Sequence, residues 1–440
     1  MKNKSTTIFK SALAMILCAS LLASCSAKPS SSTVKTDAVS SSKVEATASD
    51  GEVLNVWLPP LSSNQDDKAV WDGIMDSFEK EHNVTVNVEI VPWGNYEEKY
   101  LTGITSGKGP DVGYMYMEMI TDFIDMGALE PFDEYLDQKA KDNFLYLKNG
   151  LIRGKQYCLP IVVGNAVVMC YNKDILAANG ITEIPVTWDD FIATCKKIKT
   201  DTNGDGKDDI YRLLQKWGNP AISALNTSFY PYLWQSNGQL FNDEGTALTI
   251  DTPAGKSALQ FLYDLRFTHN ILPEITTSLT EDDCINYFAE GKSAFVEMET
   301  TNTKVFDESG VNYGFITSLS NENMGTFIAS DALVMLYNSK NKELAYQLIL
   351  HMLSESSMTT YHKSAQFPPI AKDEEYHDNP KFKDVYGKDI AALHSLQAVK
   401  GSSKIYDMLY KNIQLMMIGE LTPEQVISET TKYSTTVLSE

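Results

Sequence analysis

The stretch YCLPIVVGNAVVMCYNKD, residues 157–174, decides how this chain can fold. Residues 159–163 form a short apolar run rich in β-branched side chains, which predicts a buried strand. Gly164 and Asn165 interrupt the run, and a glycine there allows a bend or the close approach of another group. A second apolar strand resumes at 166–171, and a helical pattern begins at Ile175. A strand that breaks and continues can leave one body and enter another, with a cleft at the break.

The length of the chain also favours two bodies. It has 440 residues, of which 43% are hydrophobic, and this is more than one ordinary hydrophobic core holds. Its formal net charge is −21, and it contains no tract rich in Lys or Arg. Nucleic acid is therefore not expected as a partner, and the excess of acidic side chains favours solubility.

The first part of the chain has the pattern of an α/β lobe. Residues 54–58 read as a strand, and 84–90 alternate apolar and polar residues with a period of two. Between them Val70, Ile74 and Phe78 recur at four-residue spacing and predict a helix with one apolar face. This order predicts mainly parallel strands, with ligands at their carboxyl ends.

Three later segments begin with helix-capping residues. Thr187 is followed three residues later by Asp190, which is typical of a helix N-terminus. A threonine precedes a first-turn proline at 252–253 and again at 422–423. The second of these also has Gln425 in the capping-box position.

The N-terminus has the features of a targeting segment. Lys2, Lys4 and Lys10 precede an apolar stretch at 12–23, which is too short to span a bilayer as a permanent helix. The sequence that ends at Cys25, LASC, resembles the bacterial lipobox. That resemblance implies cleavage of a signal peptide, residues 1–24, and lipidation of Cys25 at the cell membrane; an ordinary signal with a chance cysteine is the alternative. Residues 26–51 contain eight serines and no aromatic residue, which predicts a flexible tether.

Four cysteines remain in the body of the chain, and none forms a C-x-x-C pair that would indicate zinc or redox chemistry. They are Cys158, Cys170, Cys195 and Cys284. Cys158 and Cys170 flank the interrupted strand and could form a disulfide only if folded close together. We expect free, buried thiols.

Several segments, in order, resemble bacterial extracellular solute-binding proteins of the maltose-binding type. The LP and YNKD elements of 157–174 match that family's hinge strand. GKGPDVG at 107–113 resembles its GPDV signature, and FAEGKSAF at 288–295 resembles its F..GKAAM segment. The resemblance runs with gaps from about residue 54 to the C-terminus. It implies two α/β lobes, each with a mainly parallel sheet flanked by helices, joined by hinge crossings near 163–166, 329–331 and 375–380.

The resemblance also implies a division of the chain. The lipidated cysteine and tether occupy 25–51. An N-terminal lobe comprises 52–164 with 331–377, and a C-terminal lobe comprises 165–330 with 378–440.

Candidate ligand contacts follow partly from this resemblance. Counting from the Gly-Pro-Asp motif, Glu118 takes the place of a sugar-binding carboxylate. Met115 stands where the maltose branch has an aromatic residue, a difference for which either Tyr114 or Tyr116 can compensate. Tyr406 falls near an aromatic residue that stacks on sugar. Asn165 stands where that branch has a carboxylate, so maltose itself is not implied.

Other candidates follow from residue type and position. Aromatic faces stack on the apolar faces of sugar rings, and the hydroxyl groups of sugars need polar partners. The alternative for each aromatic residue is a place in the core. The further candidates lie at strand ends, in a polar loop or in an aromatic cluster: Trp57, Asn64, Trp93, Tyr230, Trp234 and Glu299.

A calcium-loop pattern occupies residues 201–209. Carboxylate or amide side chains stand at positions 1, 3, 5 and 9, and a glycine for the turn stands at position 6. Position 12 is Arg212 instead of the bidentate glutamate, so the alternative is a polar turn that caps a helix end. The predicted metal ligands, including the backbone carbonyl of position 7, are Asp201, Asn203, Asp205, Lys207 and Asp209.

Enzyme signatures are missing from the sequence. None of the six histidines forms an i, i+4 pair, and neither G-x-S-x-G nor G-x-G-x-x-G occurs. We predict a monomeric, non-enzymatic lipoprotein on the extracellular face of the membrane that delivers a sugar or oligosaccharide to an ABC transporter permease. The alternatives are a secreted glycosidase with two catalytic carboxylates and a surface structural or adhesion lipoprotein. A peptide or polyamine ligand remains open within the binding hypothesis.

Overall fold

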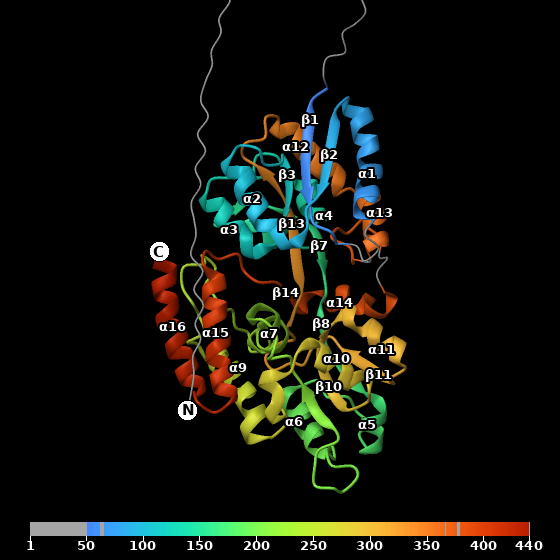
Figure 1. Cartoon of the computed structure of the whole chain (residues 1–440), viewed down its shortest axis with the longest axis vertical. Coiled ribbons are helices and arrows are strands. Elements are labelled where there is room, and N and C mark those ends of the chain that lie inside the picture. The colour runs from blue at the N-terminus through green and yellow to red at the C-terminus, as the bar shows by residue number, and fades with distance from the viewer. Residues whose placement is uncertain (1–50, 62–65, 366, 376–378, 440) are drawn as a thin grey trace, which may run out of the picture. The chain divides into compact units, whose positions relative to one another are not determined.

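The computed structural model describes residues 51–61, 66–365, 367–375 and 379–439 (Figure 1). Cys25 and Asn64 lie outside the described residues, so the signal peptide, the lipid anchor, the tether and the role of Asn64 stay predictions. In the described part of the chain no helix has the length and apolar character that a membrane span requires.

A six-stranded sheet contains the strands expected at the start of the chain. Its order is β2-β1-β3-β13-β4, with β7 beside β13. Figure 1 shows β13, from late in the chain, among the early strands. The strands are β1 Val53–Leu58, β2 Thr85–Ile90, β3 Val112–Met115, β4 Leu129–Glu130, β7 Leu159–Gly164 and β13 Ala329–Leu336.

The expectation of mainly parallel sheets is wrong in detail. β1 pairs in parallel with β2 and β3, but β13 is antiparallel to β3, β4 and β7. The reason is the route of the chain: β7 leaves this sheet at Gly164, and β13 re-enters it at the same end, with Ala329 opposite Gly164, so the two strands run in opposite directions.

The second sheet has four strands in the order β11-β8-β10-β9. It is also mixed, since β10 is antiparallel to β8 and parallel to β9. Two short pairs complete the strands: β5 Leu151–Ile152 with β6 Lys155–Gln156, and β12 Thr326–Phe327 with β14 Leu393–His394. The four strands are β8 Val167–Asn172, β9 Tyr211–Leu214, β10 Ser293–Glu299 and β11 Tyr313–Ile316.

The interrupted strand passes from one sheet to the other, as its sequence predicts. β7 ends at Gly164 in the first sheet, and β8 begins at Val167 in the second. Asn165 at the break has φ = 53°, in the left-handed region that asparagine tolerates better than most residues. A side chain at position 164 would press on the Phe367 ring, 3.1 Å from the added carbon, so the Phe367 ring would have to shift by a few tenths of an ångström.

Helices cover both sheets, and the predicted caps are present. Thr187, Thr252 and Thr422 each accept a hydrogen bond from a backbone amide three residues on, at 3.1, 3.3 and 3.3 Å. The helices are α1 Asp67–His82, α2 Tyr96–Thr105, α3 Met117–Asp125, α4 Gln138–Asn143, α5 Lys173–Ala178, α6 Trp188–Lys197, α7 Ala221–Ser228, α8 Tyr230–Gln235, α9 Pro253–Tyr263, α10 Glu281–Ala289, α11 Thr303–Ser309, α12 Lys342–Met352, α13 Glu355–Ala365, α14 Lys383–Tyr386, α15 Ser402–Met417 and α16 Pro423–Ser439.

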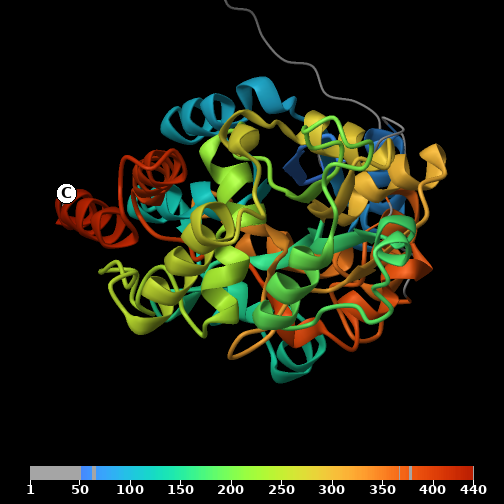
Figure 2. The same ribbon diagram turned by 90° about the horizontal axis from the view of Figure 1, so that it is seen from below.

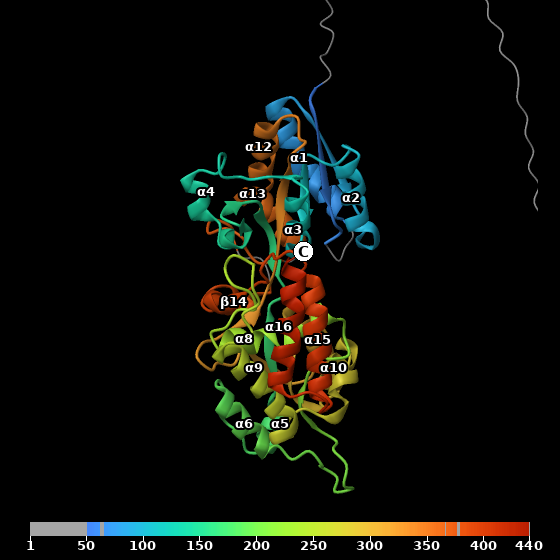
Figure 3. The ribbon, with the colours of Figure 1, turned by 90° about the vertical axis from the view of Figure 1, so that its left-hand side faces the viewer.

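The second sheet separates two hydrophobic clusters. Val168 and Cys170 belong to the cluster that continues into the first sheet, whereas Met169 and Phe295 belong to a cluster with α6 to α9, α15 and α16. Figures 2 and 3 show α15 and α16 side by side next to these helices. The four described cysteines are free and buried, as expected. Burial raises the pKa of Cys158 and Cys170 to about 12, so these thiols stay protonated.

Candidate functional site

A cavity of about 920 Å³ lies between segments of both lobes. This volume is within the range of small-molecule sites. Residues 148–153, around the 3-10 helix Leu147–Gly150, form one side. The other side comes from α8, from the loop that follows it and from residues 388–400. Tyr230, Trp234 and Tyr406, three of the predicted contacts, all line this cavity.

The aromatic residues of the cavity form a continuous wall. The Trp234 ring stacks on the His394 ring, with centroids 5.1 Å apart and planes 19° apart. Tyr230 contacts Trp234 at 5.7 Å and Tyr406 at 6.1 Å. Burial, with Lys148 nearby, lowers the pKa of His394 to about 4, so the imidazole is neutral at pH 7. The wall therefore offers uncharged ring faces, and sequence reasoning missed His394 because no motif marks it.

Three further predicted contacts, Trp93, Tyr116 and Glu118, follow strands of the first sheet and are not among the residues that line this cavity. Trp93 is 46% exposed, and its ring lies 6.4 Å from the Tyr116 ring. Burial raises the pKa of Glu118. Burial also raises the pKa of Tyr230 and of Tyr406, and the negative charge of Glu118 contributes to both rises. The structure thus brings Tyr230, Trp234 and Tyr406 together in one cavity, and Trp93 and Tyr116 together in a separate group of rings.

Other predicted contacts have different surroundings. Trp57 is 8% exposed and packs edge-on against Tyr100 in the core, at 5.3 Å. Its ring packs against α2, near Tyr100 and Gly103, so a ligand contact at Trp57 stays a prediction. Asn165 is half-buried at the crossing between the sheets. The carboxylate of Glu299 already forms an ion pair with Lys216.

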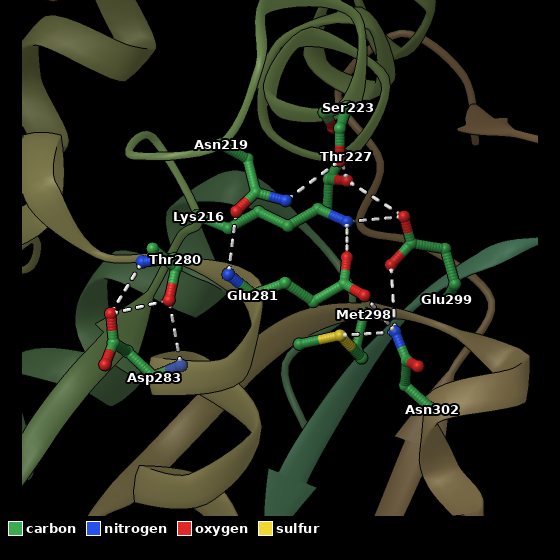
Figure 4. Close-up of polar contacts among 10 residues, drawn as sticks. All are labelled: Lys216, Asn219, Ser223, Thr227, Thr280, Glu281, Asp283, Met298, Glu299 and Asn302. Atoms are coloured by element: carbon green, nitrogen blue, oxygen red, sulfur yellow. Dashed lines mark hydrogen bonds and ion pairs between the residues drawn. The ribbon is translucent and has the colours of Figure 1, made fainter. Parts of the chain in front are cut away.

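That ion pair belongs to a polar cluster centred on Lys216 (Figure 4). The Lys216 side chain is fully buried and its ammonium contacts both Glu281 and Glu299, the latter at 2.5 Å. Asn302 donates to Glu281 at 3.2 Å and to Glu299 at 3.5 Å. The cluster fixes the start of α10 against the end of β10. Glu299 is only 18% exposed and already has these partners, so a ligand contact at Glu299 stays a prediction.

The predicted calcium loop is held by its own backbone. Asp201 accepts hydrogen bonds from two glycine amides of the loop, at 2.6 and 2.9 Å. Asp209 accepts from the opposite end of the loop, and Arg212 turns away to donate to the carbonyl of Cys195. Within the described ranges no three acidic, His or Cys side chains are grouped as a metal site requires. Calcium binding by Asp201, Asn203, Asp205, Lys207 and Asp209 stays a prediction.

A buried carboxylate in the second lobe makes stability depend on pH. Burial raises the pKa of Glu297 to about 7, although Tyr232 and Gln215 donate to it at 2.6 and 2.8 Å. The folded state then binds more protons than the unfolded state between the unfolded pKa of about 4.5 and pH 7. The free energy of unfolding should fall by about 3 kcal/mol as pH rises through this interval, from Glu297 alone.

Urea unfolding from pH 4.5 to 8 measures this effect. The variant Glu297→Gln should show a smaller decrease than the wild type over the same interval. Equal slopes for the two proteins would contradict the assignment to Glu297.

Taken together, the two sheets, the strand crossing and the cavity define a two-lobed binding protein. The family model for bacterial extracellular solute-binding proteins matches residues 62–359, more than half of the chain. The chain belongs to this family.

Individual relatives and solved structures agree with that assignment. The galactooligosaccharide-binding protein of Bacillus subtilis is 28% identical over 376 residues, which is 81% of this chain and 79% of that protein. The arabinooligosaccharide-binding protein of Halalkalibacterium halodurans is 30% identical over 194 residues, 42% of this chain and 39% of that protein. The fold resembles the maltose/maltodextrin-binding domain of Bdellovibrio bacteriovorus bound to maltotriose, with a TM-score of 0.64, 20% identity, and coverage of 88% of this chain and 100% of that chain.

Proposed function

We propose that this protein is the sugar-binding lipoprotein of an ABC importer and holds a mono- or oligosaccharide in the cavity between its lobes. The observation that carries the proposal is the aromatic wall of Tyr230, Trp234 and Tyr406 that lines this cavity. Sugar rings offer apolar faces to aromatic side chains and hydroxyl hydrogens to carboxylates. The names of the Bacillus and Halalkalibacterium relatives support an oligosaccharide as the ligand.

The remaining parts of the proposal concern movement and location. The lobes comprise 52–164 with 331–377 and 165–330 with 378–440. Bending at the crossings closes them over the sugar, and the closed form engages the permease. A lipid on Cys25 holds the protein at the extracellular face of the membrane. The protein carries out no covalent chemistry.

A thermal-shift screen tests the proposal. The panel contains galactooligosaccharides, arabinooligosaccharides, maltotriose and diacetylchitobiose, each with and without calcium. A ligand that binds only the folded state raises the melting temperature by mass action. A rise with one saccharide and no product after long incubation supports the proposal. Release of smaller sugars would identify a glycosidase, and the lack of any rise would overturn saccharide binding.

Trp234→Ala should weaken the binding of that saccharide by about tenfold or more, because one face of the stacking wall is lost; tenfold corresponds to about 1.4 kcal/mol. Isothermal titration calorimetry measures the change. Tyr337→Ala is the matched control, since Tyr337 is 56% exposed and does not line the cavity. Equal loss in the two variants, or no loss in the first, would contradict the role of the wall.

A further inference from the structure

Asp331 lies where the chain returns from the second sheet to the first. β13 pairs with β7 so that Asp331 is opposite Val162 and Ala332 is opposite Pro160, and the register passes over Ile161. A bulge of this kind bends the strand and redirects nearby side chains. The preceding residue, Ser330, is buried and accepts a hydrogen bond from Asn149 at 2.9 Å. Asp331 is half-buried and faces the opposite side of the strand, toward Tyr114.

One oxygen of the Asp331 carboxylate is fixed and the other is available. The Tyr114 hydroxyl donates to Oδ2 at 2.6 Å. Tyr114 is itself buried, and its ring lies edge-on to Trp93 with centroids 6.0 Å apart. Within the described residues no other hydrogen bond and no ion pair involves Asp331, so Oδ1 has no protein partner there. Oδ1 is also not fully buried. Oδ1 is therefore an acceptor within reach of a ligand or water.

Within the described residues, Tyr114 is the one hydrogen-bond donor to Asp331, and no ion pair involves its carboxylate. Burial raises the pKa of Asp331 to about 7, and the negative charge of Glu118 contributes to the rise. The charge of Glu118 also contributes to the raised pKa of Tyr230, which is 1% exposed and whose buried hydroxyl group has no hydrogen-bond partner among the described residues. An unpaired buried hydroxyl group is costly, so this one indicates a place where a polar ligand atom belongs.

We propose that Asp331 is a specificity-determining ligand contact, whose free carboxylate oxygen accepts a hydrogen bond from a sugar hydroxyl group beside Trp93, Glu118 and Tyr230. This inference rests on the proposed function. Two carboxylates without a cation would repel a ligand that carries an acidic group. The site therefore selects neutral saccharides and rejects uronic acids.

The variants Asp331→Asn and Asp331→Ser test the contact. Asparagine keeps the shape of aspartate but puts an amide group where the carboxylate was, and serine removes the carboxylate altogether. Glu297→Gln is the control: Glu297 is also a buried carboxylate, but both of its oxygens already accept hydrogen bonds from the protein. Melting curves without ligand establish that each variant is folded.

Affinity is measured by calorimetry with the neutral saccharides of the screen, with oligogalacturonate and with a glucosamine oligomer. We expect both Asp331 variants to bind the neutral saccharide about tenfold more weakly, as when a hydrogen bond to a charged group is lost, and Glu297→Gln to bind it normally. Unchanged affinity in the Asp331 variants would overturn the inference and leave the proposed function intact. A wild-type preference for the acidic or the amine oligomer would overturn the assigned ligand class. No saccharide binding by the wild type would overturn both proposals.

Discussion

Glu374→Ala should lower the free energy of unfolding by about 3–5 kcal/mol, because it leaves a fully buried histidine without its partner. His362 and Glu374 are 0% and 1% exposed, and Nδ1 of the histidine contacts the carboxylate. Nε2 donates to the carbonyl of Ile161 at 2.9 Å. Ile161 is the residue that the β7–β13 register passes over, so this bond satisfies a carbonyl at the bulge.

The same carboxylate also holds the loop that covers the crossing. Its second oxygen accepts from the amide of Ile370 at 3.0 Å, and Phe367 in that loop packs against Gly164. Glu374→Gln is the matched control, since an amide can donate to Nδ1 and still accept from Ile370. We expect the glutamine variant to lose less than about 1 kcal/mol. Urea unfolding at pH 7 measures both, and equal losses would show that the size of the side chain, and not its hydrogen bonding, matters at this position.

The sequence predicts the fold well where the signal is local. The break at Gly164 and Asn165, the alternation at 84–90 and the threonine caps each depend on a few neighbouring residues, and the structure confirms them. The direction of β13 cannot be predicted from neighbouring residues. It depends on where the chain re-enters the first sheet, more than 150 residues after it leaves, and the pattern of apolar residues does not indicate that position.

The site was less predictable for the same reason. Trp57 and Trp93 both follow apolar runs, yet only the packing of α2 on β1 distinguishes the buried ring from the exposed one. Asp331 accepts a hydrogen bond from Tyr114, which is 217 residues away in the sequence. Asp331 also belongs to no motif that would mark it as a candidate. By contrast, residue type and family position predicted three residues that line the cavity: Tyr230, Trp234 and Tyr406. A cluster of aromatic residues can be recognised in the sequence itself.

Lys216→Met should lower the free energy of unfolding by about 2–3 kcal/mol. The change removes the ammonium group that separates Glu281 and Glu299, and these two carboxylates then remain close together without a cation. Removing one partner of a buried ion pair costs about 3–5 kcal/mol. The expected loss here is smaller, because Glu281 is 33% exposed and water screens part of its charge.

Two further variants separate charge from packing at Lys216. Lys292→Met breaks an ion pair with Glu290 in which both side chains are about half exposed, and it should leave stability nearly unchanged because water screens the two charges. Adding Glu299→Gln to Lys216→Met should restore part of the lost stability, because one of the two facing charges is gone. Urea unfolding of the single and double variants completes a double-mutant cycle. If the second change lowers stability further, the cost of Lys216→Met comes from lost packing of the lysine chain and not from the two unpaired carboxylates.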